Sequence, residues 1–353
     1  MLKDGAMPKD GAEKIAVVLF NLGGPNAPEA VQPFLFNLFN DKAIIALPQP
    51  LRWCLATLVS HRRAPVARKI YDQIGGASPL LGLTRDQARA LEAALADRGE
   101  ARCFIAMRYW HPMTEEAVLE VKNFAPDRIV LLPLYPQFST TTSASSIAEW
   151  HRLAAAEGLH APTHALCCYP TDAGLVEAHG ALIRAAIDRV EGRFRLLFSA
   201  HGLPKKIVER GDPYVWQIER SAEAIAESLA PAYAGLDWTV CYQSRVGPLD
   251  WVGPSTEDEL RRAGAEGLAV VVVPIAFVSE HSETLVELDI DYRAIAEQAG
   301  VADYVRVPAL GVGPAFIDGL AGLVRHTLDG AADLCSHRGG RLCPAGLKGC
   351  PHG

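Results

Sequence analysis

The stretch Ala269-Val-Val-Val-Val-Pro-Ile-Ala-Phe277 is apolar at every position. A strand with one face in water would alternate apolar and polar residues, so this run predicts a strand that is covered on both faces. Such strands are typical of parallel sheets that carry helices on both sides. The stretch therefore favours an α/β fold with a buried parallel sheet.

Similar short apolar runs recur along the chain, and helical patterns separate them. The strands predicted in the first half are Ala16–Asn21, Cys103–Tyr109, Arg128–Tyr135 and Thr163–Tyr169. Those predicted in the second half are Arg195–Ser199, Thr239–Gln243, Ala269–Phe277 and Tyr304–Val307. Four strands followed by four more predict two doubly wound α/β domains, each with a four-stranded parallel sheet. One helix is expected to begin at Thr84, since Thr84-Arg-Asp-Gln87 has the pattern of a capping box.

The length of 353 residues also favours two domains. The join is expected near residues 169–176. We predict an N-terminal domain over 14–170, a C-terminal domain over 171–330 whose last helix can pack back on the first domain, and a cysteine-bearing tail over 331–353.

Charge and composition exclude several classes of protein. The net charge is −7, and no long run of Lys and Arg occurs, which argues against a nucleic-acid partner. The stretch 1–14 has no apolar signal core, and no run of 18 apolar residues exists, so we expect a cytoplasmic protein without a membrane span. Eight cysteines in such a chain do not indicate a disulfide framework.

Candidate functional groups lie where the predicted strands end, as they do in other sheets of this kind. His201 directly follows the strand run Arg195-Leu-Leu-Phe-Ser-Ala200. An imidazole there can act as a base near neutral pH or bind a divalent metal. The alternative is a structural histidine whose hydrogen bonds are satisfied inside the fold.

An acidic helix is predicted after Ala269–Phe277, with Ser279 as its cap. Four carboxylates recur at spacings of 3, 4 and 4, which places them on one helical face: Glu280, Glu283, Glu287 and Asp291. They form either a solvated surface or a ladder that passes a cation or protons. Desolvation at the helix start would raise the pKa of the first acids and suit them to proton transfer.

Two segments near the N-terminus carry further signals. Leu22-Gly-Gly-Pro25 matches neither phosphate-loop pattern and predicts a tight turn whose backbone approaches a ligand. Pro33–Val59 is rich in large apolar residues but interrupted by Asn, Asp and Pro. One alternative is a pair of helices buried in the core. The other is an exposed apolar edge that covers a hydrophobic ligand or contacts a membrane surface. The basic residues Arg62 and Arg63 follow it and can meet carboxylates or lipid headgroups.

The tail contains Cys335, Cys343 and Cys350 in a segment dense in Gly and Pro. Three thiols there suggest ligands of an iron–sulfur cluster or of zinc. The adjacent pair Cys167 and Cys168 is the best source of a fourth ligand. The alternative is a tail of reduced cysteines with no metal.

Taken together, these residues resemble the ferrochelatase family from about Ile15 to Leu328. The motifs that carry the resemblance are LFNLGGP, RRAPVARKIYDQIGGASPL, MRYWHPMTEEA, LLPLYPQFSTTTSASS, LLFSAHGLPKKIVERGDPY, CYQSRVGPLDWVGPST and VPIAFVSEHSETLVELDIDY. SAHGLP and EHSETLVELDIDY are the most diagnostic. Several long motifs in the right order make a chance match implausible.

The resemblance implies an enzyme that inserts Fe²⁺ into protoporphyrin IX, releases two protons and forms protohaem, the last step of haem biosynthesis. It implies two Rossmann-like domains of the class II chelatase type, with the porphyrin in a cleft between them. The alternatives are a non-catalytic porphyrin- or haem-binding protein, and a chelatase that uses coproporphyrin III or another divalent metal.

The resemblance also implies roles for single residues. His201 and Glu283 match the catalytic pair, and the positions matching a metal or proton path are His201, Glu283, Glu280, His281, Glu287 and Asp291. The positions matching porphyrin contacts are Leu22, Arg62, Arg63, Tyr71, Ser78, Arg108, Tyr109, Ser244, Trp251 and Phe277.

Some members of the family carry a [2Fe-2S] cluster on cysteines of a C-terminal extension. Where animal members have the fourth cysteine, this chain has Thr140. A cluster here needs a different set: Cys335, Cys343, Cys350 and one of Cys167 or Cys168. The resemblance further implies peripheral contact with the inner membrane, and cluster-bearing relatives suggest a homodimer.

Overall fold

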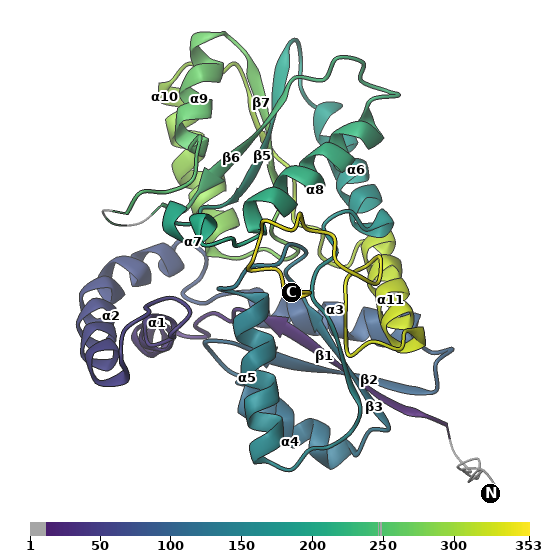
Figure 1. Cartoon of the computed structure of the whole chain (residues 1–353). Coiled ribbons are helices and arrows are strands. Elements are labelled where there is room, and N and C mark those ends of the chain that lie inside the picture. The colour runs from purple at the N-terminus through teal and green to yellow at the C-terminus, as the bar shows by residue number, and fades with distance from the viewer. Residues whose placement is uncertain (1–11, 246, 248) are drawn as a thin grey trace, which may run out of the picture.

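The computed structural model describes residues 12–245, 247 and 249–353. The N-terminal stretch behind the prediction of no export lies outside these residues, as do Val246 and Pro248 of one quoted motif. The structure has two parallel sheets, one in each half of the chain (Figure 1). The α/β prediction is confirmed.

All eight predicted strands are present, with ends shifted by a few residues. The first half supplies β1 (Lys14–Asn21), β2 (Glu100–Met107), β3 (Arg128–Pro133) and β4 (Thr163–Leu166). The second half supplies β5 (Phe194–His201), β6 (Trp238–Gln243), β7 (Ala269–Pro274) and β8 (Tyr304–Arg306). All six residues of β7 are buried, as its continuous apolar run predicted.

The first sheet has five strands, so the prediction of four is wrong there. Its order is β2-β1-β3-β4-β9, while the second sheet has the expected four in the order β6-β5-β7-β8. The extra strand β9 (Leu334–Cys335) comes from the tail and pairs in parallel with β4. A strand of two residues in a Gly- and Pro-rich segment has no periodicity to reveal it. The tail is therefore part of the first sheet.

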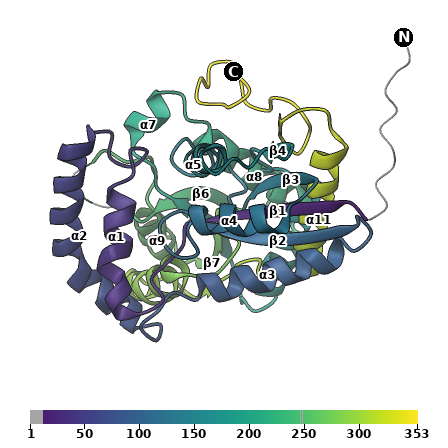
Figure 2. The ribbon, with the colours of Figure 1, turned by 90° about the horizontal axis from the view of Figure 1, so that it is seen from below.

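Helices cover both faces of the first sheet (Figure 2). One face carries α3 (Leu80–Ala94) and α11 (Pro314–Asp329), and the other carries α4 (Thr114–Phe124) and α5 (Ser143–Ala156). The prediction that α3 begins at Thr84 is wrong. Thr84 lies inside the helix, where its hydroxyl donates to the carbonyl of Leu80.

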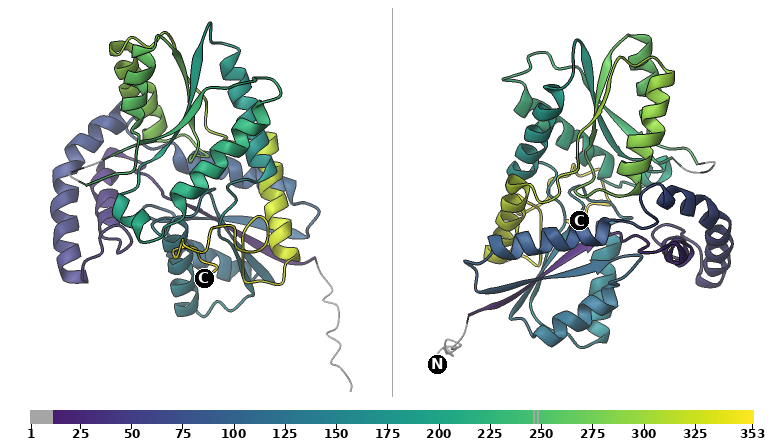
Figure 3. Two further views of the ribbon diagram at one scale, coloured as in Figure 1. Left: turned by 45° about the horizontal axis from the view of Figure 1, so that its top comes forward. Right: turned by 180° about the vertical axis from the view of Figure 1, so that it is seen from behind.

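The second sheet is covered in the same way (Figure 3). The helices α6 (Ala173–Ile187) and α8 (Tyr214–Leu229) pack on one face. The other face carries α9 (Thr256–Ala265), the π-helix η2 (Glu283–Tyr292) and α10 (Arg293–Gln298). A short helix, α7 (Lys205–Glu209), follows β5. From the end of the second half, α11 contacts α6, α3 and β4 and so ties the two halves together.

The apolar segment near the N-terminus forms η1 (Pro28–Ala30), α1 (Val31–Phe39) and α2 (Gln49–Asp72), which project beside the first sheet (Figures 1 and 2). The two helices differ in how far they bury their apolar residues, and contact with a ligand or a membrane surface stays a prediction. α1 buries Val31, Phe34 and Leu35. Around α2, several large apolar side chains are exposed: Leu47, Leu51, Trp53, Leu58 and Val66. Within the described part of the chain, no helix is long and apolar enough to cross a membrane.

Candidate active site

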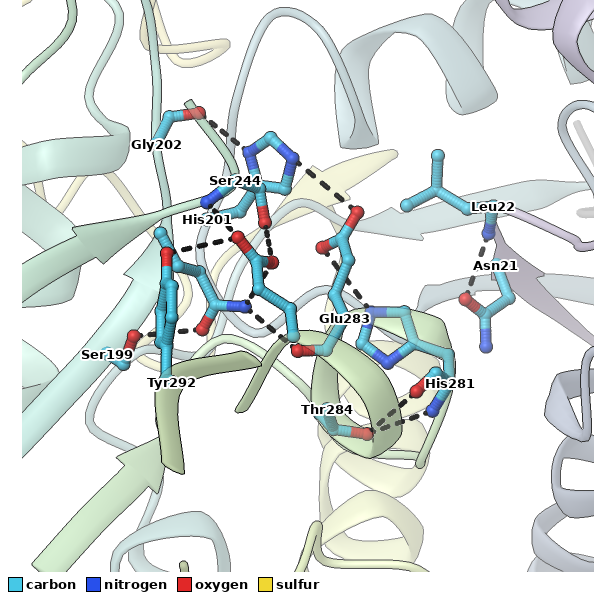
Figure 4. A network of polar contacts seen from close by, with 12 residues as sticks. Asn21, Leu22, Ser199, His201, Gly202, Ser244, His281, Glu283, Thr284 and Tyr292 are labelled. Atoms are coloured by element: carbon cyan, nitrogen blue, oxygen red, sulfur yellow. Dashed lines mark hydrogen bonds and ion pairs between the residues drawn. The ribbon is translucent and has the colours of Figure 1, made fainter. Parts of the chain in front are cut away.

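A polar network lies where the carboxyl ends of β5 and β6 meet the start of η2 (Figure 4). β5 ends at His201, β6 ends at Gln243, and η2 begins at Glu283. Three elements that are distant in sequence therefore bring their polar residues together. The placement follows the general rule for parallel sheets.

His201 presents one ring nitrogen to Glu283. Its Nδ1 lies 2.7 Å from the carbonyl oxygen of Gly202. A carbonyl oxygen only accepts, so Nδ1 carries the proton and donates it. Nε2 is then the basic nitrogen of the neutral ring, and it lies 3.6 Å from Oε1 of Glu283. The side chain is 41% exposed, so the ring is not fully buried inside the fold.

Glu283 lies between two histidines. Oε1 faces His201, and Oε2 lies 3.5 Å from Nε2 of His281. Burial alone would raise the pKa of Glu283, but the charge of His201 and the hydrogen bond and charge of His281 lower it to about 2. The prediction that desolvation raises this pKa is wrong, because the sequence does not reveal the two neighbouring imidazoles.

Glu287 is held by four donors. Oε1 accepts from the backbone N–H of Ser244 at 2.7 Å and from the hydroxyl of Tyr292 at 3.0 Å. Oε2 accepts from Nε2 of Gln243 at 3.0 Å and from the hydroxyl of Ser244. Burial and the nearby Glu283 carboxylate raise the pKa of Glu287, while these donors oppose the rise. Ser244 adopts φ 60° in order to present both donors, a strained backbone for a residue other than glycine.

The predicted ladder of four carboxylates is wrong at its first step. Glu280 precedes η2, and its carboxylate accepts from Arg306 and from the backbone N–H of Ala309. Burial would raise the pKa of Glu280, but Arg306 lowers it. Ser279 does not cap the helix either, because its hydroxyl donates to Gln87 at 3.1 Å.

The rest of the ladder lies on η2. This helix is a π-helix over its ten residues, and such turns are frequent at functional sites. Glu283 and Glu287 lie within the network, and Asp291 is exposed on the next turn. Partial burial raises the pKa of Asp291.

The residues that follow β1 approach the same network. Gly23 has φ 83°, a conformation that favours glycine, although residues 22–25 form no regular turn, and Leu22 packs against the cluster that contains Tyr71. A Cβ on Gly24 would lie 2.5 Å from the hydroxyl of Ser78 and 3.9 Å from that of Tyr71. Burial raises the pKa of Tyr71 to about 12, although a hydrogen bond with Ser282 opposes the rise. Leu22, Tyr71 and Ser78 are therefore close together, next to the start of η2.

Arg108 and Tyr109 are held by a residue that the sequence did not single out. Asp41, buried between α1 and α2, accepts from the Arg108 guanidinium at 2.9 Å and from the Tyr109 hydroxyl at 2.9 Å. The Ser145 hydroxyl donates to the same oxygen, and also accepts from Arg108. Tyr109 is only 1% exposed. Nothing in the sequence around Asp41 marked it, since its role depends on partners far along the chain.

The remaining predicted contact residues divide into two groups. Phe277 packs on the His281 ring at a centroid distance of 4.5 Å, and a Cβ on Gly202 would meet Trp251 at 3.2 Å. Phe277 therefore lies beside His281, and Trp251 lies beside the residue that follows His201. Arg62 and Arg63 instead lie exposed on α2.

Two surface pockets of 630 and 570 Å³ lie elsewhere, beside α6 and α8 and beside β6. Neither is lined by His201 or Glu283. A slot for a porphyrin at the catalytic pair thus stays a prediction.

The cysteines predicted as cluster ligands are all buried: Cys167, Cys168, Cys335, Cys343 and Cys350. The sulfur atoms of Cys167 and Cys168 are 3.3 Å apart, and Nε2 of His352 lies 3.6 Å from that of Cys167. Burial and the nearby Cys350 thiol raise the pKa of Cys343, against a hydrogen bond from Gln217. All eight cysteines of the chain are free thiols.

The donor chemistry of these thiols suits an iron–sulfur cluster. However, no group of three or more His, Cys, Asp or Glu side chains among the described residues is arranged to hold a metal ion. The thiols are gathered, but they do not surround a common point.

Comparison with known proteins identifies the family of this chain. The family model described as ferrochelatase matches residues 14–328. A protein named ferrochelatase from Caulobacter vibrioides is 54% identical over 96% of this chain and 97% of its own length. The ferrochelatase of Phenylobacterium zucineum is 55% identical, with the same two coverages. Among solved structures, SirB from Bacillus subtilis with Fe³⁺ gives a TM-score of 0.54 at 14% identity over 90% of this chain and 96% of that one, a likeness of fold.

Proposed function

The chain belongs to the ferrochelatase family, and from this premise we propose how its residues insert ferrous iron into a porphyrin for haem synthesis. We propose protoporphyrin IX as the porphyrin and protohaem as the product. Free-base porphyrin carries two pyrrole N–H protons, and Fe²⁺ replaces both of them. The site must therefore accept protons from the ring and supply charge where the metal arrives.

The observation that carries the proposal is the fixed orientation of His201. Its Nδ1 is committed to the Gly202 carbonyl, so Nε2 is the nitrogen left to take a pyrrole proton. The imidazolium that forms would lie 3.6 Å from the carboxylate of Glu283 and be stabilised by it. The neighbouring imidazoles hold the pKa of Glu283 below its usual range, which favours the ionised carboxylate and lets it attract the incoming Fe²⁺.

We propose that protons or hydrated Fe²⁺ travel along η2 between Asp291, Glu287 and Glu283, with His281 as a further partner of Glu283. The support is their order on one helix, from the exposed Asp291 to the partly buried Glu287 and Glu283. Glu280 is left out of this path because Arg306 and Ala309 already hold it. Asp291 and Glu287 are therefore expected to affect transfer and not the orientation of His201.

We propose that the porphyrin contacts Leu22, Tyr71, Ser78, Trp251 and Phe277. Arg108 would contact the ring, with Tyr109 holding it in place from the protein interior. Ser244, Arg62 and Arg63 are proposed to meet the propionates. Ser244 would have to exchange a hydrogen bond to Glu287 for one to a propionate, since both of its donors are bonded to Glu287.

Anaerobic incubation with Fe²⁺ and protoporphyrin IX tests the activity through the haem spectrum. His201→Ala should lower the rate about 10²- to 10⁴-fold, as expected for loss of a general base. His151→Ala is the matched control, because His151 is exposed on α5. Absence of turnover in the unmodified protein would contradict the activity, whereas full turnover by His201→Ala would contradict only the assignment. Coproporphyrin III and other divalent metals serve as comparison substrates.

We also propose that Cys335, Cys343, Cys350 and one of Cys167 or Cys168 hold a [2Fe-2S] cluster. The support is that all five thiols are buried and that β9 places Cys335 beside the end of β4, which Cys167 and Cys168 follow. Such a cluster is a one-electron redox centre, and no step of metal insertion requires it. Anaerobically purified protein should be reddish, and Cys343→Ser should abolish the colour while Cys54→Ser, an exposed thiol, retains it. Colourless, iron-free protein would contradict the cluster.

Peripheral contact with the cytoplasmic face of the inner membrane is a further proposal, and α2 is the surface for it. Leu51 is 61% and Trp53 is 52% exposed. Arg62 and Arg63 lie on the same helix, where they could meet anionic headgroups. Sedimentation with anionic vesicles should fall for Leu51→Ser with Trp53→Ser, but not for Leu119→Ser on α4. A homodimer, suggested by cluster-bearing relatives, is tested by sedimentation velocity.

A further inference from the structure

Gln243 is a buried residue of the site to which the proposed mechanism gives no role. It is the last residue of β6, and it pairs in register with His201 at the end of β5. Its exposed fraction is 0%, so it does not reach a bound porphyrin. Its hydrogen bonds nevertheless run to both halves of the catalytic pair.

The first link passes through the main chain to His201. The carbonyl oxygen of Gln243 accepts from the backbone N–H of Gly202 at 2.8 Å. The carbonyl of Gly202 in turn accepts from Nδ1 of His201 at 2.7 Å. A Cβ on Gly202 would lie 2.8 Å from the Gln243 oxygen, so the two strands meet here without room for a side chain. Gln243 thus fixes the residue that orients the imidazole.

The second link passes through the side chain to η2. Nε2 of Gln243 donates to the backbone carbonyl of Glu283 at 3.1 Å and to Oε2 of Glu287 at 3.0 Å. Oε1 accepts from the hydroxyl of Ser199 at 2.8 Å. Both groups on the helix can only accept, so the amide nitrogen must face them and the amide has one orientation. Both N–H donors are used, and they hold the first turn of η2.

We propose that Gln243 is a positioning residue that keeps His201 and the backbone of Glu283 in register with each other. The inference rests on the proposed roles of that pair. The buried amide contacts the backbone that carries this pair and does not touch the substrate. Its loss should therefore lower kcat and leave KM for the porphyrin unchanged.

The test is Gln243→Met, which conserves the volume but removes both donors and the acceptor. We expect kcat to fall about 10²-fold, the usual effect of a misplacement of about 1 Å at a reacting centre. Gln243→Glu should lower kcat further, because an ionised carboxylate would face the Glu283 carbonyl and the Glu287 carboxylate with no proton to donate. Porphyrin binding, measured by fluorescence quenching, should match that of the unmodified protein in both variants.

The chain supplies a matched control in Gln87. It is also 0% exposed, donates to two backbone carbonyls at 3.0 Å and accepts from the hydroxyl of Ser279 at 3.1 Å. Gln87→Met should lower Tm as much as Gln243→Met but keep kcat within about threefold of the unmodified value. A purely structural role for Gln243 would make the two variants alike in both measurements.

The proposal is overturned if Gln243→Met keeps kcat, if KM rises in place of a fall in kcat, or if Gln87→Met loses kcat equally. If Gln243→Met does not fold, Gln243→Asn gives the same comparison, since its amide is one methylene too short to reach the helix. Failure of the proposed function is a separate outcome, seen as absent turnover in the unmodified protein or full turnover in His201→Ala.

Discussion

Acid stability offers a quantitative test of the packing between the two halves, through His179. This residue lies on α6, which contacts α8, α11 and β7. His179 is only 1% exposed, and neither nitrogen of its ring has a hydrogen-bond partner among the described residues. Burial lowers the pKa of His179 from 6.5 to about 4. The folded protein therefore holds this imidazole in its neutral form.

The magnitude follows from linkage between protonation and folding. One unit of pKa corresponds to about 1.4 kcal/mol, so a fall from 6.5 to about 4 corresponds to about 3 kcal/mol. Between these two values the unfolded chain binds the proton and the folded protein does not. The free energy of unfolding therefore falls as the pH drops from 6.5 toward 4, and the loss is complete below the lower value. Above pH 6.5 His179 adds no such slope.

His179→Leu removes the titrating group and its two unpaired nitrogens. The free energy of unfolding of the variant, measured in urea at pH 7.5, 6.0 and 5.0, should exceed that of the unmodified protein by an amount that grows as the pH falls. Between pH 7.5 and pH 5.0 this difference should grow by about 2 kcal/mol, and its limit at lower pH is about 3 kcal/mol. At pH 7.5 the variant should gain about 1 kcal/mol from the loss of unsatisfied polar atoms. His151→Leu, at an exposed site on α5, is the control and should show neither effect. A difference between His179→Leu and the unmodified protein that is constant with pH would refute the reasoning.

Three other substitutions test single contacts. Asp41→Asn should lower the free energy of unfolding by about 3 kcal/mol, because it leaves the largely buried Arg108 guanidinium without its carboxylate; a loss below 1 kcal/mol in urea would contradict this. Gly174→Ala should cost about 1–3 kcal/mol in the same assay, since a Cβ there would lie 2.6 Å from a backbone oxygen of α11; unchanged stability would show that the helices can separate freely. Tyr292→Phe removes a donor to Glu287 and should cost about 2 kcal/mol at pH 7.5, with a smaller cost at low pH where that carboxyl is neutral; a cost independent of pH would argue against an ionised acceptor.

The sequence was sufficient for the fold because burial on both faces of a strand leaves a direct signal. The run Ala269–Phe277 contains β7, and each of the other seven apolar runs overlaps one of the strands β1 to β6 and β8. His201 could be found in the same way, since a polar residue that directly follows such a run must lie at the carboxyl edge of the sheet. Strand positions and strand ends are local properties, and the sequence encodes them locally.

Features that depend on distant partners could not be read in this way. Glu280 has the spacing of a ladder member, but Arg306 from β8 holds it. Thr84 has the spacing of a helix cap, but its helix starts one turn earlier and its hydroxyl also accepts from Asn21 at the end of β1. Cys335 pairs with β4 although only two residues of its segment form a strand. In each case contacts with residues distant in the sequence, and not the local pattern, decide the structure.

The pKa of Glu283 shows why residue types alone did not predict the chemistry. The direction in which burial shifts this pKa was predicted correctly, since burial raises it. The two neighbouring imidazoles lower the pKa by more than burial raises it. Asp41 and Gln243 were missed for the related reason that a single buried polar residue has no periodic signal. Their importance lies in the number of partners each one joins, which only the folded chain defines.

The distance between His201 and Glu283 places a last condition on the mechanism. Their nearest atoms are 3.6 Å apart, whereas a flat ring held between two groups needs about 7 Å, two van der Waals contacts of about 3.5 Å each. If the porphyrin binds between His201 and Glu283, one of these two side chains must move when it enters. The His201 ring is fixed by Gly202, and Gln243 holds Glu283 by its backbone carbonyl only. Rotation of the Glu283 side chain away from His201 is thus the movement that these hydrogen bonds leave free, and it preserves the backbone register on which the positioning role of Gln243 depends.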